Sequence, residues 1–233
     1  MQAVILAAGR GTRFGKLTEK TPKSLMLVRD KPILEYTLSS LPSQIDEVII
    51  IIGHLGYQIK NRFGNKFGNK KIRYLDLKNK LFGTAFSVWQ AKSILKDKFL
   101  VINGDDLYDK KEFTKLIKPD LAVGLAKSTP PSPKYLNIEL DKNKNIIGTK
   151  YPTGKEMKTG ILMATGAYAL NKYIFKYRLI KISSGEYGLP QVVFKMARNQ
   201  PVKGVIMQNW IQINTPEEIK NAIAILDKPR SRR

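Results

Sequence analysis

The sequence has 233 residues, of which 41 are Lys or Arg and 19 are Asp or Glu, giving a formal net charge of +22. With 42% hydrophobic and 26% charged residues, the composition is that of a globular protein, which excludes a disordered or fibrous chain. The absence of cysteine excludes disulfides, thiolate zinc sites and cysteine nucleophiles, and a single histidine leaves little room for a histidine-based metal site or triad. Chemistry must rest on Asp, Glu, Lys and Arg.

No apolar run reaches the roughly 20 residues of a membrane span, and the first residues lack the pattern of a cleavable signal. We therefore expect a cytoplasmic protein without a membrane span. The net charge has three interpretations: a lysine-rich solvated surface, steering of phosphorylated substrates, or a nucleic-acid partner. Because the lysines are scattered and no nucleic-acid-binding signature accompanies them, we expect no specific nucleic acid as a partner.

Strand and helix patterns alternate through the first half of the chain. Short buried strands are predicted over residues 2–8, 47–52, 71–75 and 99–103. Helices are predicted over 32–41 and 84–95, with another between the second and third of these strands. This alternation is typical of a doubly wound α/β sheet.

After Asp109 the pattern changes to strands joined by turns, predicted over residues 122–126, 135–140, 145–150 and 161–170, which indicates a β-rich insertion. A helix over 189–198, a strand over 202–207 and a helix over 215–226 close the domain. Thr215 is predicted to cap the last helix, with Pro216 at its first position and Glu218 completing a capping box.

A glycine-rich loop follows the first predicted strand, where backbone amides can turn toward an anion. It matches neither common phosphate motif. A dinucleotide fingerprint needs glycine where Phe14 stands, and a Walker loop needs Ser or Thr after Lys16, where Leu17 stands.

The loop, residues 6–13, reads LAAGRGTR, and seven residues later positions 21–25 read TPKSL. This spacing resembles the signature of the sugar-1-phosphate nucleotidylyltransferase family. The resemblance continues over nearly the whole chain, at residues 83–85, 103–106, 164–168, 184–187 and 210–215.

The resemblance implies a Rossmann-like, doubly wound mixed α/β sheet with a β-rich inserted sugar-binding region, as in nucleotide-diphospho-sugar transferases. It predicts a single nucleotidyltransferase domain over residues 1–227, followed by a basic tail over 228–233. Within the domain, residues 1–110 form the nucleotide-binding core, and residues 120–215 bind the sugar phosphate and complete the sheet.

The reaction that the resemblance implies joins a nucleoside triphosphate to a sugar 1-phosphate and releases pyrophosphate, by in-line attack with Mg²⁺. The partners are then these two substrates, and a homo-oligomer is left open. Two alternatives stay open: a cytidylyltransferase acting on phosphocholine or a similar non-sugar phosphate, and a non-catalytic regulatory or binding module of the same fold.

The resemblance also assigns site residues. The catalytic set is Arg13, Lys23 and Asp105, because in-line transfer mainly requires anions to be positioned and neutralised. The nucleotide-binding set is Ala8, Gly9, Gly11, Thr12, Arg13, Lys23, Asn79, Gly83 and Thr84. The sugar-phosphate-binding set is Asp105, Lys150, Thr165, Gly166 and Glu186.

The metal site is expected at Asp105, which follows a predicted strand and so lies where the ligands of parallel sheets bind. Magnesium prefers oxygen ligands and often takes only one or two carboxylates. Gln212 stands where the family usually has a second aspartate, and Asn214 is the nearest oxygen donor that could replace it, so the second ligand is either residue. Asp106 is either an indirect support for the metal site or an ordinary turn residue, and His54 is expected to be structural.

Overall fold

The computed structural model describes residues 1–77, 83–133 and 135–227. Its strands are β1 (Gln2–Ala7), β2 (Leu27–Val28), β3 (Lys31–Pro32), β4 (Glu47–Ile52), β5 (Lys66–Phe67), β6 (Lys70–Asp76), β7 (Lys98–Asn103), β8 (Ala122–Ser128), β9 (Asn137–Leu140), β10 (Ile146–Lys150), β11 (Ile161–Asn171) and β12 (Lys203–Ile206). Its α-helices are α1 (Leu17–Lys20), α2 (Ile33–Ser40), α3 (Gly56–Phe63), α4 (Thr84–Gln90), α5 (Lys110–Leu116), α6 (Glu156–Thr159), α7 (Leu189–Ala197) and α8 (Pro216–Asp227). Three 3₁₀ turns accompany them in the described residues: η1 (Thr12–Phe14), η2 (Lys23–Leu25) and η3 (Lys172–Lys176).

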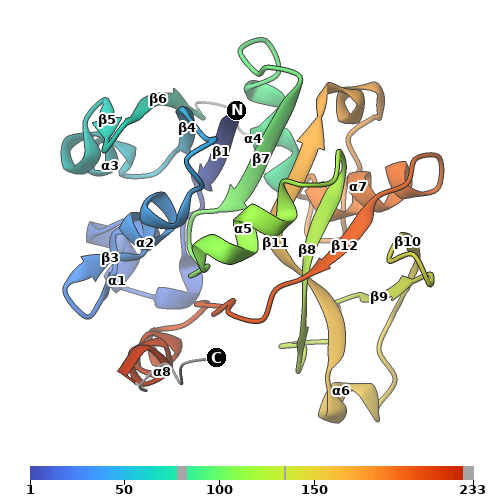
Figure 1. Cartoon of the computed structure of the whole chain (residues 1–233). Coiled ribbons are helices and arrows are strands. Elements are labelled where there is room, and N and C mark those ends of the chain that lie inside the picture. Colours follow the sequence, from blue (N-terminus) through green and yellow to red (C-terminus); the bar gives the residue numbers. More distant parts are fainter. Residues whose placement is uncertain (78–82, 134, 228–233) are drawn as a thin grey trace.

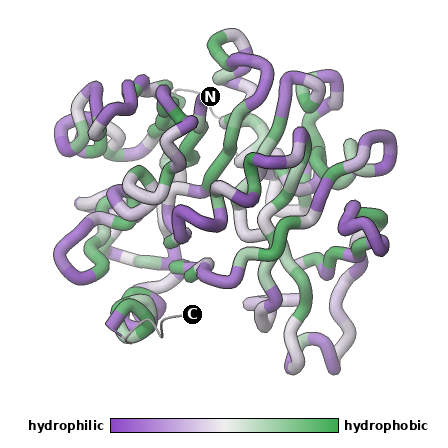
Figure 2. Tube along the Cα trace, in the orientation of Figure 1, coloured by the Kyte–Doolittle hydropathy of each residue, from purple (hydrophilic) through white to green (hydrophobic). Residues whose placement is uncertain are grey.

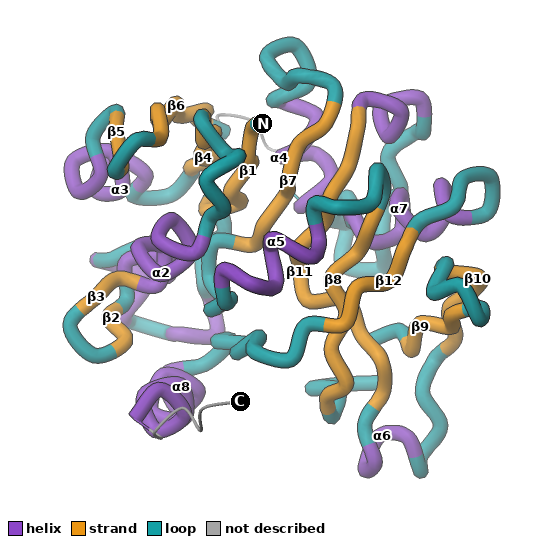
Figure 3. The backbone as a smooth tube through the Cα atoms, viewed as in Figure 1, coloured by secondary structure: helices purple, strands orange, loops and turns teal. Residues whose placement is uncertain are grey.

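One large mixed sheet runs through the molecule in the order β12-β8-β11-β7-β1-β4-β6-β5 (Figures 1 and 3). Strands β7, β1, β4 and β6 are parallel to one another. Strand β11 runs antiparallel to both β7 and β8 and so joins the two halves of the chain in one sheet. Because β1, β4 and β7 point the same way, their carboxyl ends meet at one edge of the sheet, where ligands of such sheets usually bind.

Helices cover both faces of the central strands because the strands are apolar on both sides. In β4, Ile50 and Ile52 pack on the face covered by α2, α3 and α5. Ile49 and Ile51 pack on the opposite face, against α4 and α7. All four are fully buried, and burial of one such side chain contributes about 1.5–3 kcal/mol. Figure 2 shows this pattern along the chain: hydrophobic residues follow the central strands, and hydrophilic residues occupy the outer loops.

The fold class predicted from the sequence is confirmed: the chain forms a large mixed α/β sheet with helices on both faces. Strand β4 has the predicted bounds, and most other predicted elements differ from the structure by one to three residues at an end. Helix α4 is shorter than predicted, since it ends at Gln90 and is followed by turns. At the last helix, the Glu218 carboxylate accepts a hydrogen bond from the Thr215 amide at 3.3 Å, which is one half of the predicted capping box; the Glu218 amide donates to the Thr215 carbonyl at 3.2 Å instead of to its side chain.

Helix α5 was missed, as were the short helices α1 and α6. Residues after Asp109 were predicted to be strands joined by turns, but α5 (Lys110–Leu116) comes first. The Asp109 side chain accepts a hydrogen bond from the amide of Lys111 and so caps it. The lysine-rich helix α5 buries only two apolar side chains, those of Phe113 and Leu116. Two positions are too few to show the hydrophobic periodicity of a helix in the sequence.

The β-rich segment divides between two places. Strands β8 and β11 belong to the main sheet, whereas β9 and β10 pair only with each other in a separate antiparallel hairpin. This hairpin and α6 lie together at one end of the molecule, away from α3 and β5 (Figure 1).

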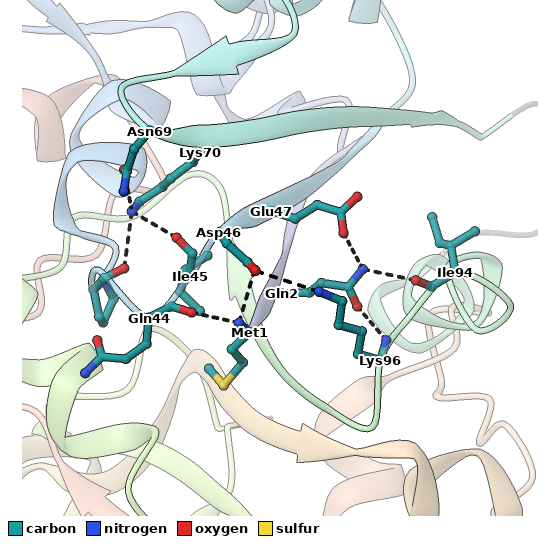
Figure 4. A network of polar contacts seen from close by, with 11 residues as sticks. Met1, Gln2, Gln44, Ile45, Asp46, Glu47, Asn69, Lys70, Ile94 and Lys96 are labelled. Carbon is teal, nitrogen blue, oxygen red and sulfur yellow. Dashed lines mark hydrogen bonds and ion pairs between the residues drawn. The ribbon is translucent and has the colours of Figure 1, made fainter.

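Polar side chains close the amino-terminal edge of the parallel strands (Figure 4). The buried amide of Gln2 donates to Glu47 Oε2 at 2.7 Å and to the carbonyl of Ile94 at 3.0 Å. The buried Lys70 ammonium donates to the carbonyls of Pro42 at 3.2 Å and Ile45 at 3.1 Å, and burial lowers its pKa. With this edge closed, the carboxyl-terminal edge is left to bind ligands. In the described part of the chain, no helix is both long and apolar enough to cross a membrane.

Candidate active site

A cleft of about 1260 Å³ opens at the carboxyl ends of β1, β4 and β7. Ala8 follows β1, Gly53 follows β4 and Asp105 follows β7, and all three line it. Sites for one small ligand commonly measure about 300–1,000 Å³, so this cleft has room for two. We call its two walls the loop side (residues 8–13, 23–24 and 105) and the strand side (residues 135–138, 163–168 and 182–194).

The loop side is shaped by the glycine-rich segment after β1. Gly11 has φ +64°, and a Cβ there would lie 2.9 Å from Thr18 Cγ2 and 3.0 Å from Lys23 Cβ. A side chain at this position would therefore push the loop off the lysine. The Thr18 hydroxyl holds the loop closed by contacting the carbonyls of Gly11 and Gly15, each at 3.1 Å. Arg13, in η1, is exposed and lines the cleft.

Lys23 and Asp105 form an ion pair on the loop side, with 2.6 Å between Nζ and Oδ2. The lysine is 9% exposed, whereas 37% of the Asp105 side chain is accessible. The ammonium also lies 5.5 Å from the centre of the Phe14 ring. The fold thus brings together two residues 82 positions apart, Lys23 in η2 and Asp105 in the loop after β7.

Asp106 is a buried support for the site rather than an ordinary turn residue. It is 4% exposed, and its carboxylate accepts hydrogen bonds from Trp210 Nε1 at 3.1 Å and from the amide of Ile213 at 3.0 Å. Burial, and then the charge of Asp105, raise the pKa of Asp106 to about 8. These contacts anchor the segment that carries Gln212 and Asn214 into the cleft.

The turn before α4 lies between the two sides and contacts the loop before α7, which belongs to the strand side. Gly83 has φ +119°, and a Cβ there would lie 2.4 Å from the backbone of Tyr187, so only glycine permits this approach. The Ala85 amide donates to the carbonyl of Tyr187 at 2.9 Å, and the Leu189 amide donates to Thr84 Oγ1 at 2.9 Å. These bonds hold Glu186, which lines the cleft, between two fixed elements.

Apolar side chains dominate the rest of the strand side. Ile138 from β9, Met163 from β11 and Phe194 from α7 all line it. Thr165 is buried and donates to the carbonyl of Gly124 at 3.0 Å, and Gly166 follows it on β11.

Three residues that line the cleft each carry a buried polar atom with no hydrogen-bond partner among the described residues: Ser24 Oγ, Gln191 Oε1 and Asn214 Nδ2. Buried polar atoms are nearly always satisfied, so these are candidates for ligand contacts. Sequence reasoning missed Ser24 and Gln191. Ser24 could have been found, because it lies beside Lys23 in the TPKSL motif, whereas nothing around Gln191 in the sequence marks it.

The structure brings most predicted site residues to this one cleft. Those that line it are Ala8, Gly9, Gly11, Thr12, Arg13, Lys23, Gly83, Thr84, Asp105, Thr165, Gly166, Glu186 and Asn214. Lys150 does not line it and instead lies 3.4 Å from Glu139 and 3.8 Å from Glu156 in ion pairs. Asn79 lies outside the described residues. His54, expected to be structural, is exposed and lines the cleft.

The sequence matches a known protein family and several curated proteins over nearly its whole length. A family model described as "Nucleotidyl transferase" matches residues 2–226. The chain is 30% identical over 229 residues to the bifunctional protein GlmU of Methanococcus vannielii, an alignment that covers 95% of this chain and 54% of the relative. The chain thus spans about half the length of the curated relatives it matches most strongly.

Solved structures share the fold. A protein from Bacillus anthracis described as a "Putative Glucose-1-Phosphate Thymidylyltransferase" superposes with a TM-score of 0.80 at 22% identity, covering 100% of this chain and 98% of that one. A UDP-glucose pyrophosphorylase complexed with UDP-glucose superposes with a TM-score of 0.81 at 18% identity, covering 97% of each chain.

Proposed function

The chain belongs to the nucleotidyl transferase family, and on that premise we propose that it transfers a nucleotidyl group from a nucleoside triphosphate to a sugar 1-phosphate, releasing pyrophosphate. One observation carries the proposal: a single large cleft has a charged loop side and a largely apolar strand side. The sugar phosphate oxygen attacks the α-phosphorus, the bond to the β-phosphate oxygen breaks, and pyrophosphate leaves. The protein's main tasks are then to position two anions and to stabilise the departing charge.

The loop side is assigned to the triphosphate. Backbone amides of residues 8–12 can face phosphate oxygens, and Arg13 offers a planar fork for two of them. Lys23 offers a compact charge for the leaving pyrophosphate. Gly83 and Thr84 complete the proposed nucleotide site within the described residues. Accordingly, residues 1–110 supply most of the nucleotide half of the domain.

We propose Mg²⁺ as the cofactor. Asp105 offers an accessible carboxylate at the end of β7, and Asn214 lines the same cleft with an amide nitrogen that has no partner among the described residues. If that amide turns over, it presents its oxygen instead, so the pair suits a hard cation that keeps several water or phosphate ligands. When bound, the ion would neutralise phosphate charge. Gln212 remains the alternative second ligand.

The strand side is assigned to the sugar 1-phosphate. Glu186 can accept hydrogen bonds from sugar hydroxyls, and Thr165 and Gly166 of β11 line the same cleft. We leave Lys150 out of this set because its ammonium is held by Glu139 and Glu156 away from the cleft. Residues 120–215 therefore supply most of the acceptor half.

The test is a matrix of nucleoside triphosphates against sugar 1-phosphates, with phosphocholine as a non-sugar acceptor and pyrophosphate release as the readout. We expect release to require both a triphosphate and a sugar 1-phosphate. Release with phosphocholine alone among the acceptors would support the cytidylyltransferase alternative. Tight binding of substrates without release in any pair would support a non-catalytic module.

A further inference from the structure

Lys23 lies where a metal ion would have to bind. Its Nζ is 2.6 Å from Asp105 Oδ2, closer than the ordinary distance for a charge-assisted hydrogen bond to a carboxylate. Within the described residues no cluster of three or more His, Asp or Glu side chains that could hold a metal ion is found, in the cleft or outside it, so Asp105 is the only carboxylate proposed as a metal ligand. The carboxylate proposed to bind the metal is therefore already paired with a cation from the protein itself.

The surroundings hold the lysine in this position. Its backbone belongs to η2, where the Met26 amide donates to the Lys23 carbonyl at 3.0 Å, and its Cβ packs against Gly11. Its ammonium lies over the Phe14 ring, and only 10% of the side chain is accessible. Because the site is partly shielded from water, a divalent cation at the same carboxylate would repel the ammonium strongly.

We propose that Lys23 is an internal counter-ion that keeps Asp105 from binding divalent metal until a triphosphate draws the ammonium away. The identity of the releasing ligand rests on the proposed function. One positive charge then serves two successive purposes. It occupies the carboxylate in the free protein, and it contacts phosphate oxygens once the nucleotide and metal arrive together. Metal and triphosphate consequently bind with positive coupling, since each favours the arrangement in which the ion pair is open.

The experiment measures Mn²⁺ binding to the free, full-length protein by electron paramagnetic resonance, without nucleotide. Lys23→Met should bind Mn²⁺ at least about fivefold more tightly than the parent, the lower end of typical couplings between sites. Lys23→Arg keeps the pair and should bind as weakly as the parent. Asp105→Asn combined with Lys23→Met should lose the gain, which identifies the carboxylate involved.

A matched control distinguishes the effect of the Lys23–Asp105 ion pair from that of the overall positive charge of the protein. Lys20 is an exposed lysine on α1, and Lys20→Met removes the same charge from the net +22. It should change Mn²⁺ affinity by less than about twofold, because an exposed charge is largely screened by salt. Circular dichroism shows whether each variant is folded, and Lys23→Gln replaces Lys23→Met if the latter is not.

Equal Mn²⁺ affinities of Lys23→Met and Lys20→Met would overturn the proposal, as would a gain that survives Asp105→Asn. The titration contains no nucleotide or sugar and measures no turnover. A failure of the proposed function in the substrate matrix would therefore be seen separately from a failure of this inference.

Discussion

The two sides of the cleft are built in different ways. On the loop side, polar and charged groups are close together and fixed, as in the 2.6 Å pair between Lys23 and Asp105 and, next to it, the two hydrogen bonds to buried Asp106. On the strand side, Glu186 lies among apolar residues such as Ile138 and Phe194. Under the proposed function, this contrast separates chemistry from acceptor choice: the loop side should control turnover, and the strand side should control acceptor affinity.

The largest effect is expected for Asp105→Asn. Loss of the carboxylate removes the main proposed metal ligand, so kcat/KM should fall by about a thousandfold, the upper end for loss of one electrostatic group. The loss should persist at every magnesium concentration. Steady-state pyrophosphate release measures it, with Asp120→Asn, an exposed carboxylate, as the control. Near-parental turnover would move the catalytic centre elsewhere.

Lys23→Ala comes next. Pyrophosphate departs carrying negative charge, and without the ammonium kcat should fall by at least about a hundredfold. Lys20→Ala removes an exposed lysine of the same segment and should leave kcat unchanged. Activity of Lys23→Ala within threefold of the parent would end its assignment to the leaving group.

Asp106→Ala tests how much the hydrogen bonds to Asp106 contribute to the stability of the fold beside the loop side. It leaves Trp210 Nε1 and the Ile213 amide buried without an acceptor, and we expect the free energy of unfolding to fall by about 3 kcal/mol near pH 5.

The pKa of Asp106 is raised in the folded state to about 8, so its stabilising effect is complete below the unfolded value of 3.8 and is lost as the pH rises through 8. The difference between parent and variant should therefore shrink from pH 5 to pH 8. Urea unfolding at several pH values measures it, and a difference that grows with pH would contradict the direction of the shift.

Glu186→Gln probes the strand side. The amide keeps the shape of the side chain but weakens hydrogen bonds from sugar hydroxyls, so KM for the sugar 1-phosphate should rise about tenfold. KM for the triphosphate should not change. If both constants rise together, the two sides are not separable in the way proposed.

The smallest effect is expected for Asn214→Ala, because an amide is a weak metal ligand. Turnover should fall about fivefold at low magnesium and recover as magnesium is raised. Gln212→Asp is the companion variant: if position 212 faces the metal, the new carboxylate should lower the magnesium concentration needed for half-maximal turnover. Magnesium titrations of both variants distinguish the two candidate ligands.

Sequence patterns predicted the centre of the fold well because its physical signals are local. The buried run of β4 and the apolar β7, each followed by a turn, place Gly53 and Asp105 at the strand ends without any knowledge of tertiary structure. The motif spacing then predicted Lys23 and Arg13 as site residues, and both line the cleft. The local hydrophobic pattern did not predict α5, because this helix is rich in lysine and has a narrow apolar face.

Long-range contacts could not be predicted in this way. Trp210 donates to Asp106 across 104 positions, and no nearby residue indicates that this carboxylate is buried. Lys150 was predicted at the site from its place in a motif, but Glu139 and Glu156 approach it only once β9, β10 and α6 have packed together. Gln191 becomes a site candidate only because α7 brings it to the cleft.

The central claim is that one cleft joins a nucleotide to a sugar 1-phosphate, and ³¹P nuclear magnetic resonance tests it most directly. With the best substrate pair of the matrix and magnesium, the sugar phosphate signal should be replaced by two coupled diphosphate signals together with pyrophosphate, and Asp105→Asn should stop the change. Conversion of the triphosphate to nucleoside diphosphate and phosphate, with the sugar 1-phosphate left intact, would contradict the account.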